Sequence, residues 1–208
     1  MEKVTAMKKR LEVQDGIAML TVMLLMLMLT VLGVAAITVS GLEINMAGMQ
    51  RSTEAASVAA ESGIGTAVNI LRQTIDDGSI PAGYIGGSNP VPTASANPST
   101  GASLADEING RSDNDADSVT ASPDLVLPSV GAFTVSCDID RLYSRTKSGS
   151  AIMFASAYDG VGAGAGGGGV EFVYRIDCLA TNTATNTNSR TVAVYSCNFT
   201  SETCQKKI

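Results

Sequence analysis

The chain has 208 residues, with 14 Lys and Arg against 20 Asp and Glu, and it contains four Cys but no His and no Trp. The acidic balance argues against a nucleic-acid-binding protein, whose affinity rests on Lys and Arg neutralising phosphates, and the absence of His removes Ser-His-Asp triads, Cys-His pairs and His-bearing zinc sites. This composition favours a structural or interaction protein, so we predict no enzyme, no catalytic residue and no resident organic cofactor.

A short basic leader opens the chain. Residues 1–16 hold four basic side chains against three acidic ones, and no charge then occurs between Asp15 and Glu43. Because about 20 apolar residues suffice to cross a bilayer, residues 17–42 are predicted to span a membrane as a helix. The basic flank is predicted to stay in the cytoplasm, so the remainder of the chain is exported. A signal-peptidase cut after Ala36 is the competing interpretation, but the preceding apolar run is longer than such signals use.

The predicted helix continues beyond the membrane. After residue 42, apolar or small residues recur at spacings of three and four, while polar residues fall largely on the other faces. The series consists of Leu42, Met46, Met49, Ala56, Ala60, Ile64, Val68, Leu71 and Ile75. Gly78 supplies the left-handed geometry of a helix C-cap, so one long helix is predicted for residues 17–77.

Residues 78–131 differ sharply in composition. All six prolines lie there, among many Ser, Thr, Asn and Gly residues. No long apolar period is present, which predicts a Pro/Ser/Gly-rich surface loop region with one helical turn at residues 104–109.

An acidic motif lies within this region. Asp113, Asp115 and Asp117 alternate as at the start of an EF-hand calcium loop, and Asp124 falls at its twelfth position. However, Ser118 stands where the sharp turn of such a loop needs Gly. Two interpretations remain open, a solvated acidic loop and a calcium site built from the three aspartates.

Residues 132–208 carry the period-2 patterns of strands with one buried face. Phe133, Val135, Cys137 and Ile139 alternate with polar residues, and a second alternating series runs over residues 170–178. Residues 191–197 are also rich in strand-forming types, and residues 151–158 are a further candidate strand. The amphipathic half of the helix would cover the buried face. The predicted fold class is therefore α+β, with a long N-terminal helix packed on a small antiparallel sheet of three to four strands.

All four cysteines lie in the exported part, where an oxidising compartment favours disulfides. Cys137 and Cys178 each fall on the apolar face of a predicted strand, so they can meet across the sheet. Cys197 and Cys204 would then close a short C-terminal disulfide loop. Pairing of Cys178 with Cys197 is the main alternative among the three pairings that four cysteines allow.

The N-terminal third resembles a known family. Gly16-Ile17, between the basic leader and the apolar run, is similar to the prepilin peptidase site of type IV pilins. More narrowly, several short motifs resemble PilX-type minor pilins: Leu32-Gly33, Glu43, Asn45, Met46-Ala47-Gly48, Arg51 and Ala59-Ala60-Glu61-Ser62-Gly63. The resemblance implies that residues 1–16 are a prepilin leader, that cleavage falls between Gly16 and Ile17, and that the new amine is methylated.

The chain departs from the common pilin pattern at the fifth residue after that bond. Most pilins carry Glu there, and the resemblance implies that this Glu neutralises the amine of a neighbouring subunit. In this chain the residue is Thr21, which carries no charge. Because an uncompensated buried ion costs several kcal/mol, a subunit with Thr21 is unsuited to a place below another subunit. We therefore expect a position near the filament tip. The alternative is that Thr21 is one more tolerated residue in a membrane helix.

The resemblance implies a minor pilin of a type IV pilus, held in the inner membrane by one span before assembly and found in the extracellular filament afterwards. Its implied partners are other pilins, the prepilin peptidase, the inner-membrane assembly platform and a tip adhesin. A pseudopilin of a type II secretion system is the nearest alternative. A membrane-anchored exported binding domain that never polymerises is the alternative from a different class.

Overall fold

A computed structural model describes residues 2–97, 103–111, 118–146, 170–198 and 203–207 of the chain. The chain divides into two compact units, Met1–Arg51 and Ser52–Ile208. The candidate strand at residues 151–158 and the aspartates at positions 113, 115 and 117 lie outside the described residues.

The first element is the helix α1, Glu2–Asp77. It begins well before the predicted start at residue 17, because the leader is rich in good helix formers such as Glu, Lys, Met and Leu and contains neither Gly nor Pro before Gly16. It ends where the sequence predicted. Gly78 follows with a φ of 69°, the left-handed conformation that closes a helix at little cost for glycine.

Three short helices follow: η1 (Ala82–Tyr84), α2 (Thr93–Ala96) and α3 (Leu104–Asn109). The turn predicted at residues 104–109 is thus present. Ser103 caps it, since its hydroxyl accepts a hydrogen bond from the Asp106 amide. This region is more than a surface loop, because it contributes buried side chains to the core: Ile80, Val91, Ala96, Leu104 and Ile108.

The sheet has five strands: β1 (Leu125–Val130), β2 (Phe133–Thr146), β3 (Val170–Asn182), β4 (Thr187–Asn198) and β5 (Thr203–Lys206). Their order in the sheet is the order in the chain, and every neighbouring pair is antiparallel. The predicted α+β class is confirmed, but with two strands more than the patterns at β2, β3 and β4 had indicated. The additional strands are the two edges of the sheet.

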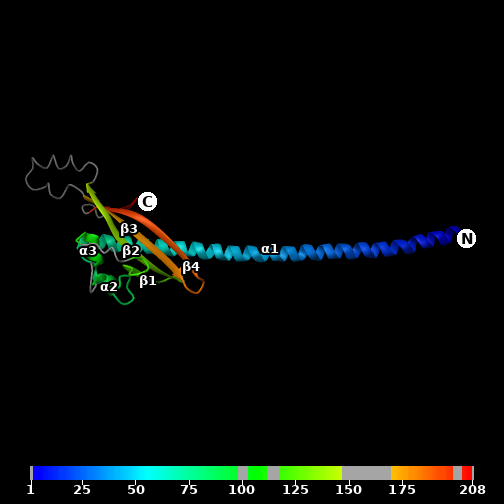
Figure 1. Ribbon diagram of the computed structural model, residues 1–208, viewed down its shortest axis with the longest axis horizontal. Coiled ribbons are helices and arrows are strands. Elements are labelled where there is room, and N and C mark those ends of the chain that lie inside the picture. Colours follow the sequence, from blue (N-terminus) through cyan, green and yellow to red (C-terminus); the bar gives the residue numbers. More distant parts are fainter. Residues whose placement is uncertain (1, 98–102, 112–117, 147–169, 199–202, 208) are drawn as a thin grey trace, which may run out of the picture. The chain divides into compact units, whose positions relative to one another are not determined.

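The core lies between the sheet and the second half of α1, which Figure 1 shows beside β2, β3 and β4. The helix contributes mainly small side chains to this contact, and the sheet contributes β-branched and larger ones. The buried helix residues are Ala56, Ala59, Ala60, Gly63, Ile64, Ala67, Ile70, Leu71, Thr74 and Ile75. Met46 and Met49 had been placed in the same stripe, yet they are 65% and 75% exposed. The buried part of the stripe therefore begins at Ala56.

Candidate functional site

The N-terminal half of α1 displays its large apolar side chains instead of burying them. From Ile17 to Met49 these side chains are between 50% and 75% exposed. The stretch includes one segment that is long and apolar enough to cross a bilayer, which fits a single-pass anchor. Contiguous apolar surface of this extent is rare on a soluble monomer and marks a surface that lipid or another protein covers.

The residues of the predicted processing site all lie within this helix. Ile17 is 60% exposed. The Thr21 hydroxyl donates a 2.8 Å hydrogen bond to the carbonyl of Ala18, and the Thr30 hydroxyl does the same to Leu27. Thr21 is thus satisfied within its own turn, which lets a polar side chain lie in apolar surroundings. The side chain carries no negative charge.

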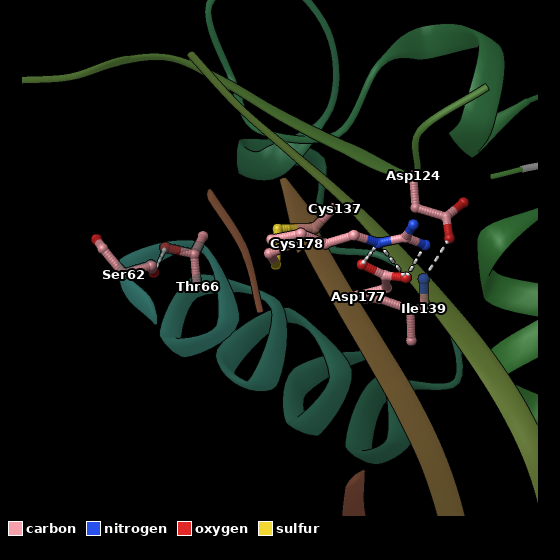
Figure 2. The surroundings of a disulfide bond; sticks show 8 residues. Ser62, Thr66, Asp124, Cys137, Ile139, Asp177 and Cys178 are labelled. Carbon is pink, nitrogen blue, oxygen red and sulfur yellow. Dashed lines mark hydrogen bonds and ion pairs between the residues drawn. A yellow bond between two sulfur atoms is a disulfide. The ribbon is translucent and has the colours of Figure 1, made fainter. Parts of the chain in front are cut away.

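The second half of α1 contacts a disulfide. Cys137 and Cys178 lie directly opposite each other on β2 and β3, their Cα atoms are 4.1 Å apart, and the two residues are joined and fully buried. Figure 2 shows the bond above the helix turn that carries Ser62 and Thr66. A Cβ atom added at Gly63 would lie 2.9 Å from the Cys137 sulfur and 2.6 Å from Val135 Cγ1. The helix can approach the disulfide this closely only because residue 63 has no side chain.

A second disulfide joins β4 to β5. Cys197 and Cys204 are directly opposite in the register of these strands, with Cα atoms 4.0 Å apart. The structure thus has the pairing that the strand alternation favoured, and Cys178 is not joined to Cys197. The bond holds a four-residue edge strand that would otherwise rest on few contacts.

The outer face of the sheet, opposite α1, is covered with ion pairs between neighbouring strands. The Arg175 guanidinium lies 2.6 Å from the Asp140 carboxylate, and Arg190 donates two hydrogen bonds from Nε and one from Nη2 to Asp177. Asp177 itself is only 4% exposed. These contacts satisfy charges that burial would otherwise penalise.

The most heavily bonded carboxylate is Glu171, on β3. It accepts hydrogen bonds from Arg145 on β2, at 2.6 Å, and from the Ser196 hydroxyl on β4, and it lies 3.2 Å from the Lys207 ammonium just after β5. We call these four residues the Glu171 cluster. The Arg145 hydrogen bond, assisted by those from Ser196 and Lys207, lowers the pKa of Glu171 to about 2. The cluster therefore links β2, β3, β4 and the residue that follows β5 through one ionised group.

Asp124 does not serve as a free metal ligand. It is 2% exposed, and its two oxygens accept hydrogen bonds from the Ser95 hydroxyl and the Ile139 amide, both at 2.9 Å. Figure 2 shows the carboxylate turned toward Ile139. This residue therefore anchors the start of β1 to α2 and β2. Among the described residues, no group of three His, Cys, Asp or Glu side chains is arranged to hold a metal ion, and the calcium site at Asp113, Asp115 and Asp117 stays a prediction.

A buried tyrosine links the sheet to α3. The Tyr174 hydroxyl donates a 2.7 Å hydrogen bond to the Ile108 carbonyl, and the residue is fully buried. Burial raises the pKa of Tyr174 to about 12, so the hydroxyl stays protonated and remains a donor at physiological pH. This bond fixes the position of α3 against β3.

Comparison of the chain with protein-family models, with curated proteins and with solved structures gave no match. The architecture itself, a long N-terminal apolar helix whose second half packs on an antiparallel sheet, is compatible with a pilin-like fold.

Two functional features escaped the sequence interpretation. Gly63 was recognised only as part of a motif, although the motif carries a physical signal, since a glycine inside a helix stripe of alanines indicates close backbone approach. The Glu171 cluster gave no such signal. Its four members are far apart in sequence, and only the strand register brings them together.

Proposed function

We propose that this chain is a minor pilin of a type IV pilus, incorporated through its N-terminal helix. The single observation that carries the proposal is the division of one helix into two kinds of surface. Residues 17–49 expose large apolar side chains all around, while the later turns pack into the core of a disulfide-linked domain. A plain membrane anchor does not need to continue as the central helix of the domain that it holds.

Within a filament, the exposed apolar residues would leave lipid and pack against the equivalent helices of other pilins. The contact replaces one apolar environment with another, so the hydrophobic cost of leaving the bilayer is small. The leader at residues 1–16 must first be removed, because its charges oppose packing in an apolar bundle. The prepilin peptidase and the assembly platform in the inner membrane are the partners that this route requires.

We further propose a position near the tip. An amine on Ile17 of a subunit above would find Thr21 below it, and that hydroxyl already donates to Ala18. No amine lies above a subunit at the tip, so the missing charge has no cost there. From that position the globular domain would prime assembly and present an interaction surface to other minor pilins or a tip adhesin.

The test is the mature N-terminus together with the location of the chain. Mass spectrometry of the protein from cells should find Ile17 as the first residue, and sheared filaments should contain it. Substitution Gly16→Leu should block both, while Gly33→Leu, which places the same change in the same helix, should preserve cleavage. A mature chain beginning at Met1 or Ile37 that is found only in the membrane would overturn the proposal in favour of an anchored binding domain. Loss of secretion but not of pili on deletion would instead identify a secretion pseudopilin.

Position along the filament needs a separate measurement. Gold labelling of the globular domain should place the native chain at filament ends. The substitution Thr21→Glu should allow labels along the shaft, because the added carboxylate can compensate an amine from above. An unchanged label distribution would contradict the tip assignment while leaving the minor-pilin assignment intact.

A further inference from the structure

The two edges of the five-stranded sheet differ in how far other residues cover them. At β1, the outward-facing amide of Val126 donates a 2.7 Å hydrogen bond to the Pro90 carbonyl. Two residues further along, Pro128 has no N–H to offer. A covering loop and a proline are two of the ways in which proteins prevent an edge strand from pairing with another chain. The β1 edge is therefore closed.

The opposite edge is covered only in part. β5 pairs with β4 at four positions, from Asn198 to Tyr195, and the Lys207 amide adds one 2.8 Å hydrogen bond to the Val194 carbonyl. Over residues 187–194, no other described residue pairs with this side of β4.

The open backbone groups can be assigned by residue. In an antiparallel ladder, alternate residues direct both their N–H and their C=O to the same side. The Lys207 bond shows that Val194 faces away from β3, so Asn188, Arg190 and Val192 do too. No described residue pairs with their backbone donors and acceptors, which form a template from Asn188 to Val192.

Within the described part of the chain, this edge lacks the features that usually protect an edge strand. Its register with β3 runs without a bulge from Asn198 to Thr187, and the strand has no proline. The charge of Arg190 is held on the outer face by Asp177, so it does not block the edge. Val192 adds an apolar side chain that is 50% exposed. A regular edge with unpaired backbone groups and an exposed Val is suited to strand addition.

We propose that residues 187–193 of β4 bind an extended segment of another polypeptide as a sixth strand. The charge of Lys206 determines which extended segments should bind best. Lys206 ends β5 opposite Tyr195, is exposed and has no ion-pair partner among the described residues. A strand added antiparallel to β4 would run in the direction of β5, so its first residue would lie opposite Ala193, two positions beyond Lys206 and on the same face of the sheet. The long Lys206 side chain can reach that position, which favours Asp or Glu there. A β-branched apolar residue would lie opposite Val192. This recognition does not depend on incorporation into a filament.

The test measures amide exchange by NMR on the full chain in detergent micelles, with a synthetic hexapeptide as the probe. The peptide has Asp first, followed by alternating Val and Thr residues. Before addition, the amides of Asn188, Arg190 and Val192 should exchange quickly, and those of Thr191 and Ala193, which face β3, slowly. The peptide should slow the three outward amides by about tenfold or more, a pattern with period 2 that only strand pairing produces.

Two variants separate edge pairing from folding. Val192→Pro removes an outward N–H without removing a bond to β3, so it should abolish the peptide effect while the far-ultraviolet circular dichroism spectrum is retained. Val192→Thr keeps the N–H and the β-branched shape and should preserve most of the effect. A peptide with Lys in place of Asp should bind about tenfold more weakly, because it meets Lys206.

Several results would overturn the proposal. Slow exchange of the outward amides in the absence of peptide would mean that the chain covers its own edge. Equal protection in Val192→Pro would exclude strand pairing. Protection that rises with protein concentration in the absence of peptide would identify a second copy of this chain as the occupant, in place of a different polypeptide.

Discussion

The two halves of α1 have the same secondary structure and opposite surroundings. Leu29 and Val58 are almost equally exposed, at 67% and 65%, but Leu29 belongs to a stretch that is apolar on every side, whereas Val58 stands alone among polar neighbours. The first half uses large side chains, and the second buries small ones against a sheet. The exposure of a single residue therefore does not show whether the surface around it needs an apolar partner. The extent of the apolar surface shows that the first half needs an external apolar partner and the second does not.

The strongest test of this difference between the two halves of α1 is to place charges on each half in turn. Each Lys at the centre of a span costs about 2.5–3.5 kcal/mol, so Leu25→Lys with Leu29→Lys should cost about 6 kcal/mol of membrane insertion. Val58→Lys with Ser62→Lys has the same spacing on an exposed face and should change insertion little. The fraction of chain in sodium carbonate-washed membranes measures both. Retention of the first variant in the membrane would contradict the assignment of the span.

The second prediction concerns the disulfides, which lie only in the second unit. A bond that closes a longer loop restricts the unfolded chain more, and the two separations are 41 and 7 residues. Replacing Cys137 and Cys178 by Ser should therefore lower the free energy of unfolding by about 4 kcal/mol, and the same change at Cys197 and Cys204 by about 2.5 kcal/mol. Chemical denaturation of the detergent-solubilised chain provides the measurement. The reverse order would show that loop closure is not the dominant effect.

The third prediction uses two glycines of the same helix. Gly63→Ala would place a Cβ atom against Val135 and the Cys137 sulfur, so it should destabilise the domain by about 1–3 kcal/mol. Gly65→Ala meets nothing within 4 Å and should be neutral or stabilise the domain by up to about 1 kcal/mol. Thermal unfolding of both variants measures the difference. Equal effects would mean that the helix does not approach the sheet at Gly63.

The smallest expected effect depends on pH. The folded pKa of Glu171 is about 2, below the ordinary value of 4.5, so the group stabilises the fold at pH values above about 4.5, and that contribution is lost as the pH falls toward 2. Glu171→Gln should therefore cost about 1–2 kcal/mol at pH 7, since one partner of a partly exposed pair is lost. The difference from the native chain should vanish near pH 2.

Glu61→Gln, on the exposed face of α1, is the matched control and should leave stability unchanged at both pH values. Denaturation midpoints at pH 7 and near pH 2 provide the comparison. A Glu171→Gln effect that persists unchanged in acid would show that the carboxylate charge is not what stabilises the domain.

Periodicity predicted the elements that bury one face along their length. The helix end at Gly78, the strands β2, β3 and β4, and the pairing of Cys137 with Cys178 all follow from spacings of three to four or of two. β1 and β5 were missed because their local signals are weak. Pro128 argues against a strand, and β5 has four residues. Both are edge strands, where pairing on one side tolerates such sequences.

The sequence by itself determined the charge-free apolar stretch, the amphipathic continuation of the helix and the alternation of the central strands, because each is a repeat within a few consecutive residues. Only the tertiary structure decided that Gly63 lies against a disulfide, that Glu171 bonds to residues of β2 and β4 and to Lys207, and that the described residues cover the β1 edge of the sheet but only part of the β4 edge. These features depend on the register between segments up to about a hundred residues apart, and no local pattern encodes that register.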